Sequence, residues 1–218
     1  MKAWKPKVQN LRFTEPPTDP RSWGARCDIC PLRGQKPVLG DGKLNATLAV
    51  VGEAPGREEE ERGIPFVGKS GESMTEALER AGTSRSAVWI DNAVACFPPG
   101  GDMKAFIQRS KKETKARAQE WHSPVDCCRP RLFFALGIPT CGTCSKFTAG
   151  PDACTCPQAR PVYPNWKGVE RQPARAFLML GNAAMEALMG VEGITNRQMY
   201  VHSIPWRGPD AMVLRGPP

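Results

Sequence analysis

The sequence predicts an α/β protein of three layers, with helices on both faces of a central parallel sheet of four strands, plus a cysteine-rich insertion. Two observations favour this fold. Short apolar runs alternate with segments of helical periodicity, and the first of these runs ends in a glycine- and proline-rich turn. Strands are expected at 47–51, 88–91 and 176–180, and residues 199–204 and 211–214 could add one or two more. With 218 residues, the chain is long enough for one domain with a substantial core.

Two helices are predicted between these strands. In the first, over 70–81, apolar residues recur at helical spacing at Met74, Ala77, Leu78 and Ala81, and Gly82 follows. The second, over 182–189, begins behind Asn182 as N-cap and ends at Gly190. A strand–helix–strand order of this kind favours parallel strands with crossover helices.

The domain is expected to span residues 25–218, preceded by an amino-terminal arm over 1–24 that is rich in proline and tryptophan. Two insertions are expected, a basic one at about 101–126 and a cysteine-rich one at 137–172. Because neither a signal peptide nor a long apolar segment appears, we expect the reducing environment of the cytoplasm.

The most informative segment is Gly52-Glu53-Ala54-Pro55-Gly56, which follows the apolar run 48–51 and precedes a second glycine-rich stretch, 63–68. Ligands of open α/β sheets bind at the carboxyl ends of strands, and glycine lets backbone N–H groups approach a ligand closely. Phe66 in the second stretch offers an aromatic face for stacking. The alternative is an ordinary strand-to-loop turn with a buried phenylalanine.

Cysteines form a second pattern. A Cys-x-x-Cys pair, Cys27 and Cys30, is followed by Cys96 and by the adjacent Cys127 and Cys128. A close pair with distant partners suits a centre held by four thiolates, either iron–sulfur or zinc. Disulfides are the competing interpretation.

Four further thiols occur in the insertion, at Cys141, Cys144, Cys154 and Cys156. Two close pairs across a short loop are typical of a zinc knuckle, and a bound zinc would stabilise a segment with little apolar core. Disulfide formation is again the alternative.

The charge balance favours a polyanionic partner. Thirty Lys and Arg residues against 22 Asp and Glu residues give a net charge of +8. Basic residues are densest over 104–117, at Lys104, Arg109, Lys111, Lys112, Lys115 and Arg117. A solvated helix face explains this segment equally well as contact with phosphates does.

Taken together, these segments resemble the family 4 uracil-DNA glycosylases, the iron–sulfur branch of the uracil glycosylase superfamily. The resemblance covers most of residues 25–190. It rests on five segments, which occur in the family's order: Gly52–Gly56, Gly63–Gly68, Asp91–Pro99, Cys128–Leu132 and Leu180–Ala184.

The resemblance implies a four-iron, four-sulfur (4Fe–4S) cluster on Cys27, Cys30, Cys96 and Cys128, with Cys127 as the alternative to its neighbour. It also implies a uracil pocket formed by Gly52, Ala54, Pro55, Gly56, Phe66 and Asn92.

In such a pocket, Phe66 would stack on a uracil flipped out of DNA, and the amide of Asn92 would read the O4 and N3–H edge. Backbone N–H groups near Glu53 and Ala54 would stabilise the departing uracil anion. Glu53 would orient the attacking water or balance charge on the sugar. The implied activity is hydrolysis of the N-glycosidic bond in base excision repair of uracil-containing DNA, single- or double-stranded.

The sequence departs from the family at one motif. The family carries a His-Pro-Ser or His-Pro-Ala motif, whereas no His-Pro occurs here and the only histidines are His122 and His202. The chain could be truncated, another residue or chain could take over that role, or the protein could bind without efficient excision. Two other functions therefore stay open: a non-catalytic DNA-binding or polymerase-associated module, and a covalent uracil-DNA binder that uses His122.

Overall fold

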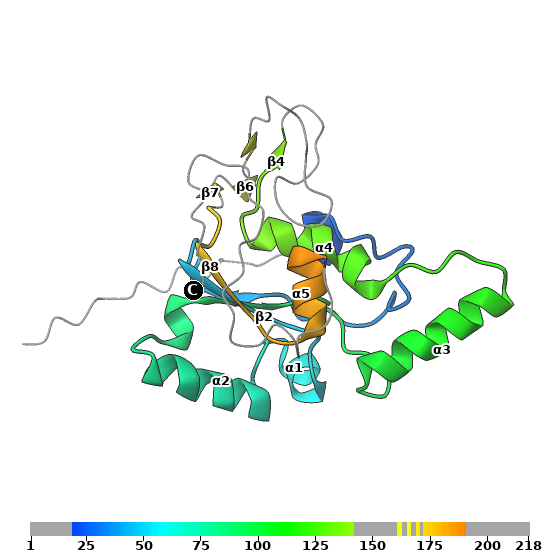
Figure 1. Cartoon of the computed structure of the whole chain (residues 1–218), viewed down its shortest axis with the longest axis horizontal. Helices are drawn as coiled ribbons and strands as arrows, with labels where there is room; N and C mark the ends of the chain where they lie inside the picture. The colour runs from blue at the N-terminus through cyan, green and yellow to red at the C-terminus, as the bar shows by residue number, and fades with distance from the viewer. Residues whose placement is uncertain (1–18, 142–160, 163–164, 167–168, 171, 191–218) are drawn as a thin grey trace, which may run out of the picture.

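The structure is a computed structural model, and it describes residues 19–141, 161–162, 165–166, 169–170 and 172–190. A four-stranded sheet lies at its centre, with the order β1 (Asp41–Gly42), β3 (Trp89–Asn92), β2 (Leu48–Gly52) and β8 (Ala176–Met179). β2 pairs in parallel with both β3 and β8, while β1 pairs antiparallel with β3 at the edge. Figure 1 shows the helices arranged around these strands.

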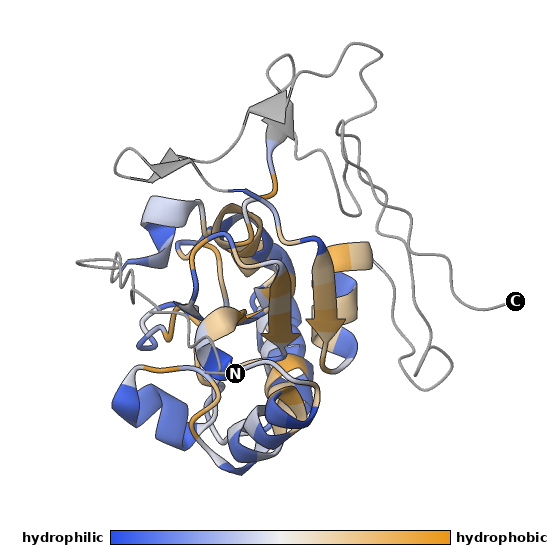
Figure 2. Ribbon diagram, turned by 90° about the vertical axis from the view of Figure 1, so that its left-hand side faces the viewer, coloured by the Kyte–Doolittle hydropathy of each residue, from blue (hydrophilic) through white to orange (hydrophobic). Residues whose placement is uncertain are grey.

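Side chains of β2 alternate between two apolar clusters, one on each face of the sheet. Val50 packs with Met74 and Leu78 of α2 (Lys69–Arg80). Ala49 and Val51 belong to the larger cluster, which includes residues of α4 (Pro124–Ala135) and α5 (Asn182–Met189). Figure 2 shows the apolar strands lying between helices with hydrophilic outer faces. The predicted three-layer α/β fold is therefore confirmed.

The predicted strands 47–51, 88–91 and 176–180 correspond to β2, β3 and β8 within one residue at each end. The fourth strand differs from the prediction, because it is the two-residue antiparallel β1, so the sheet is mostly rather than wholly parallel. Such a short strand carries no periodicity that a sequence could reveal. The candidate strands 199–204 and 211–214 lie outside the described residues.

The predicted helix 70–81 is α2, followed by Gly82 with a φ of 77°. Its Met74 and Leu78 are buried, but Ala77 is exposed. The prediction of Asn182 as N-cap of α5 was wrong by one residue, because Gly181 occupies that position and Asn182 begins the helix.

The remaining elements surround this core. They are η1 (Pro20–Trp23), α1 (Arg57–Arg62), η2 (Arg85–Ala87) and α3 (Met103–Ala116), with two small antiparallel pairs, β4 (Thr140–Cys141) with β5 (Pro161–Val162) and β6 (Asn165–Trp166) with β7 (Val169–Glu170). α3 extends away from the body in Figure 1. In the part of the expected amino-terminal arm that the structure describes, Trp23 is buried and stacks on Phe134 of α4 at 5.6 Å between ring centroids.

The predicted zinc knuckle lies outside the described residues at Cys144, Cys154 and Cys156, and only the backbone of Cys141 is described, within β4. None of the described helices combines the length and apolar character that crossing a membrane requires.

Candidate functional site

The carboxyl ends of β2 and β3 lie side by side, because Gly52 is the register partner of Asn92. A Cβ added to Gly52 would lie 2.5 Å from Asn92 Oδ1 and 2.5 Å from Phe66 Cζ. The Asn92 amide and the Phe66 ring therefore meet over the one position where the strand has no side chain. This arrangement brings together three of the residues that the sequence predicts for a base pocket.

An unusual backbone conformation presents the Phe66 ring. Phe66 has a φ of 55°, which few residues other than glycine adopt, so its surroundings must hold it there. Arg85 does so by donating from Nη1 to the Phe66 carbonyl at 2.7 Å and from Nη2 to the Pro65 carbonyl. Gly71 packs directly against the Phe66 carbonyl, where no side chain would fit. Burial lowers the pKa of the Arg85 guanidinium, although nearby Asp41 and Glu59 favour its charge.

The acidic run 58–61 forms most of the short helix α1. Glu59 of this helix accepts a hydrogen bond from the Gly68 N–H at 3.0 Å. One carboxylate of the run thus ties the glycine-rich stretch 63–68 to the segment that follows β2.

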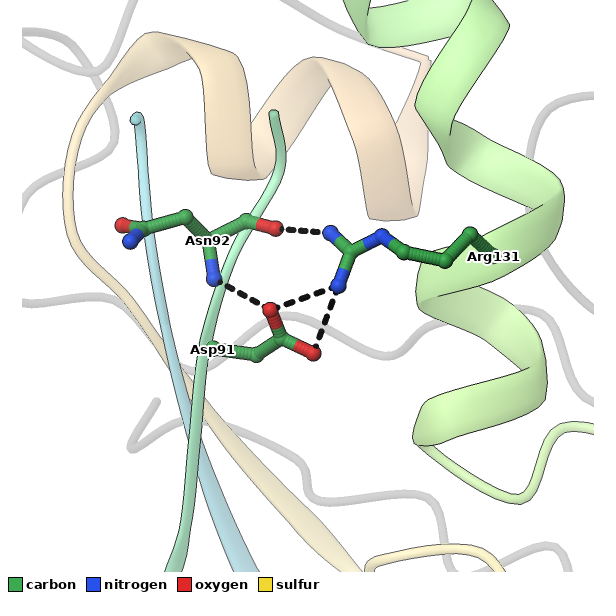
Figure 3. A network of polar contacts seen from close by, with 3 residues as sticks. All are labelled: Asp91, Asn92 and Arg131. Carbon is green, nitrogen blue, oxygen red and sulfur yellow. Dashed lines mark hydrogen bonds and ion pairs between the residues drawn. The ribbon is translucent and has the colours of Figure 1, made fainter. Parts of the chain in front are cut away.

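Asn92 is held from behind by a buried ion pair (Figure 3). Arg131 of α4 donates from Nη1 to both carboxylate oxygens of Asp91, at 2.7 and 2.9 Å, and from Nη2 to the Asn92 carbonyl at 2.5 Å. Asp91 Oδ1 also accepts from the Asn92 N–H at 2.7 Å. Both polar groups of the Asn92 backbone are thereby fixed, and the side-chain amide points away from the pair toward Gly52.

Glu53 follows Gly52 directly and is exposed to solvent. Partial desolvation of its carboxyl group and the negative charge of Asp102 raise its pKa above the ordinary glutamate value. The Glu53 carbonyl accepts a hydrogen bond from the Val94 N–H at 2.9 Å, which ties the loop to the chain beyond β3. A carboxyl group of raised pKa beside a base pocket can exchange protons closer to neutrality than an ordinary one.

The cysteines of the body converge on a separate cavity of about 550 Å³, lined by Cys27, Cys30, Cys96, Cys127 and Cys128 among others. Backbone hydrogen bonds hold its walls together. The Arg26 N–H donates to the Cys127 carbonyl at 2.9 Å, and the Val38 N–H donates to the Ala95 carbonyl at 2.7 Å. The loop that carries the Cys-x-x-Cys pair is therefore docked on both α4 and the segment after β3.

All five thiols are free. Burial raises the pKa of Cys96 to about 12, and the nearby thiols of Cys128 and Cys27 add to this shift while Arg131 opposes it. A hydrogen bond between the thiols of Cys30 and Cys127 raises the pKa of Cys30 and lowers that of Cys127. Buried thiols this close to one another would be stabilised by a cation that binds their thiolate forms.

Within the described residues, no group of three or more Cys, His, Asp or Glu side chains is arranged around a single metal ion. The same cysteines nevertheless line one cavity. A multi-iron cluster is larger than one ion and separates its thiolate ligands further, so a wide thiol-lined cavity fits a cluster better than a mononuclear zinc site.

α3 carries the basic segment as the sequence predicts. Its Lys104, Arg109, Lys111, Lys112 and Lys115 are exposed, as is Arg117, which caps it. Met103 and Phe106 bury the opposite face. The Lys111 ammonium lies 4.4 Å from the centroid of the Trp121 ring, so one lysine of this surface has an aromatic partner.

Sequence reasoning missed Arg85, Asp91 and Arg131 as parts of the site. For Asp91 a signal existed, since a charged residue directly after Trp89 and Ile90 of a buried strand requires a buried partner. Nothing in the sequence near Arg85 indicates that it reaches the backbone of residues 65–66.

The sequence profile of the Uracil DNA glycosylase superfamily matches residues 39–167, more than half of the chain. A type-4 uracil-DNA glycosylase of Pyrobaculum aerophilum is 38% identical over 114 residues, which are 51% of this chain and 56% of that protein. Proteins of the same name are 43% identical over 114 residues in Thermotoga maritima (51% of this chain, 57% of the relative) and 44% identical over 113 residues in Archaeoglobus fulgidus (51% and 54%). The chain thus spans little more than half the length of these curated relatives.

Proposed function

Because the chain belongs to the uracil DNA glycosylase superfamily, we propose that it removes uracil from DNA by hydrolysing the N-glycosidic bond. The observation that carries this proposal is the meeting of the Asn92 amide and the Phe66 ring over Gly52. This arrangement offers a hydrogen-bonding edge and a stacking face to a planar base, and Gly52 adds no side chain of its own. Relatives named type-4 uracil-DNA glycosylases support the same activity.

Recognition begins with a uracil flipped out of the DNA, since its target bond is inaccessible within a stacked duplex. The Asn92 amide donates to uracil O4 and accepts from N3–H, a pairing that the amino group of cytosine would oppose. Phe66 stacks on the uracil ring. Arg85 keeps the phenylalanine ring in place by donating a hydrogen bond to the Phe66 carbonyl. A methyl group in place of a Gly52 hydrogen would collide with the Phe66 ring and the Asn92 amide.

The chemical step breaks the bond between uracil N1 and the sugar C1′, and the electron pair leaves on the base. Backbone N–H groups near Glu53 and Ala54 are the candidate donors to the uracil anion. Glu53 as a carboxylate orients the water whose oxygen bonds to C1′, and the proton that this water loses passes to the carboxylate. The proton then leaves Glu53 for solvent, the uracil anion takes up a proton from solvent, and the products are an abasic site and free uracil.

Cys27, Cys30, Cys96 and Cys128 are the residues that we propose as ligands of a 4Fe–4S cluster, with Cys127 as the alternative to Cys128. When bound, such a cluster supplies a cross-link among the amino-terminal loop, the segment after β3 and α4. The cavity and its docked loop support this assignment.

DNA would reach the pocket along a positively charged surface. The exposed basic residues of α3 supply one, and the acidic α1 beside the pocket loop supplies none. We therefore assign phosphate contact to α3, which predicts that DNA binding weakens as salt rises.

One experiment tests the proposal. The purified protein is incubated with single-stranded DNA that contains one uracil, and with the same strand containing thymine. Alkali then cleaves any abasic site, and a denaturing gel without alkali detects a covalent adduct. We expect cleavage of the uracil strand only. Asn92→Ala should lower the rate by about a hundredfold or more, the usual cost of losing a donor to a developing charge. Gln119→Ala, which removes an exposed amide, is the control.

Other outcomes would replace this proposal. Equal binding of both strands without base release over hours would indicate a non-catalytic DNA-binding module. A band shift that persists in denaturant and disappears in His122→Ala would indicate a covalent uracil-DNA binder.

A further inference from the structure

The buried pair of Asp91 and Arg131 lies between the two candidate centres, the base pocket and the thiol cavity. Both side chains have no exposed surface. Burying two charges is costly, and an apolar pair of similar volume would often stabilise a fold as well or better. Stability alone therefore does not explain why a charged pair lies between the two centres.

One side of the Arg131 guanidinium faces the base pocket. Its Nη2 donates to the Asn92 carbonyl at 2.5 Å, and its Nη1 holds the Asp91 carboxylate that accepts from the Asn92 N–H. Figure 3 shows this fork closing on the Asn92 backbone from α4. The orientation of the base-reading amide thus depends on where α4 places Arg131.

Arg131 is also an electrostatic partner of the thiol cavity. It follows Cys128 by three residues on α4, about one helical turn, and its charge acts on both Cys128 and Cys96. Its third nitrogen, Nε, carries a buried N–H that has no hydrogen-bond partner among the described residues. A buried donor without a partner is rare in native proteins, and the inorganic sulfides of a bound cluster are acceptors that would satisfy it.

We propose that Arg131 is a positioning residue that couples the two centres. Its Nη1 and Nη2 order the Asn92 backbone, while its charge acts on the sulfurs of Cys96 and Cys128 and its Nε–H is available to a cluster sulfide. The inference rests on the proposed function, since it assumes that the thiols hold an iron–sulfur cluster and that Asn92 reads uracil. It adds that binding at the cysteines and base recognition share one buried guanidinium.

The first test is a double-mutant cycle on uracil excision. Arg131→Lys keeps the charge but loses the planar fork, so kcat/KM should fall by about tenfold or more, as for a lost hydrogen bond to a charged group. In an Asn92→Ala background the same substitution should cost only about twofold, because no amide remains to be positioned. Equal losses in both backgrounds would show that Arg131 does not act through Asn92 and would overturn this half of the proposal.

The second test uses the reduction potential of the cluster, measured without DNA. Asp91→Asn together with Arg131→Gln removes both charges and leaves no unpaired buried ion, so the fold should survive. The potential should become more negative, because Arg131 outweighs Asp91 at Cys128 and its cation favours the reduced, more negative cluster. Arg129→Gln is the matched control. Arg129 is the neighbouring cation on α4, but it binds backbone carbonyls of α5 and Asp126 instead, so the potential should not move.

The outcomes separate the inference from the proposed function. Iron-containing protein that releases no uracil would refute the proposed activity, whereas a shifted potential in the paired variant would still support the action of Arg131 on the sulfurs. An unshifted potential in that variant, or native protein without iron after anaerobic preparation, would overturn the coupling.

Discussion

Gly52→Ala should disable the base pocket while leaving the fold intact. Gly52 is not among the described glycines of positive φ, so alanine adds no backbone strain there. The added methyl group would instead lie 2.5 Å from both Phe66 Cζ and Asn92 Oδ1. Carbon atoms normally stay roughly 3.5–4.0 Å apart, so the ring must retreat by about 1 Å or more, and the amide must turn away as well.

The size of the effect follows from these two displacements. Loss of base stacking alone costs roughly 1–3 kcal/mol, which corresponds to about 5- to 150-fold in kcat/KM. The fold should lose less, because the half-buried Phe66 can relieve the overlap by moving toward solvent. We expect about 1 kcal/mol, near the lower limit for overpacking, and a melting temperature lower by about 2–4 °C.

The assay is single-turnover release of uracil from a single-stranded substrate, with thermal unfolding followed by circular dichroism. Gly68→Ala is a matched control, since its methyl group would approach only the ends of two glutamate side chains, Glu59 at 3.2 Å and Glu58 at 3.8 Å, and much less activity should be lost. In a Phe66→Ala background, the stability cost of Gly52→Ala should shrink, because one of the two overlaps has gone. Unchanged excision and melting in Gly52→Ala would refute the pocket geometry.

Three further predictions concern the surroundings of the pocket. Arg85→Met removes the two donors that hold the carbonyls of Pro65 and Phe66, so the affinity for uracil-containing DNA should weaken by about tenfold or more in a binding titration. Native affinity would contradict this role of Arg85. The raised pKa of Glu53 means that the active carboxylate is lost as the pH falls through a value above that of ordinary glutamate. Asp102→Asn keeps the helix cap but removes a negative charge, so the acid limb of the rate profile should move to lower pH, and an unmoved limb would exclude Glu53 as the titrating group. Cys128→Ala should bleach the visible absorption of the cluster, whereas Cys127→Ala should retain it; the reverse result would exchange the two ligands.

Local signals were enough to locate several elements of this protein. Short apolar runs bounded by turn residues predicted β2, β3 and β8, although β3 ends in the buried polar residues Asp91 and Asn92 and β8 is only partly buried. The segment Gly52–Gly56 was predicted to be a binding loop because it follows the end of a strand, whereas Phe66 and Asn92 were assigned to a base pocket through the family resemblance. The superfamily was recognised from the same short segments, and the profile match confirms it.

The tertiary structure decided what depends on contacts between distant segments. Asp91 and Arg131 are 40 residues apart, and only the packing of α4 against β3 makes them a pair. Arg85 reaches residues 65 and 66 because the chain returns past the pocket loop before β3 begins. The edge strand β1 exists only because Asp41 and Gly42 pair with Ile90 and Trp89. The sequence by itself determined which residues could bind a base and a cluster, because residue type sets that chemistry. The tertiary fold determined which other residues hold these binding residues in place. A buried charge or a strained backbone is stabilised only by partners that folding brings within hydrogen-bonding distance.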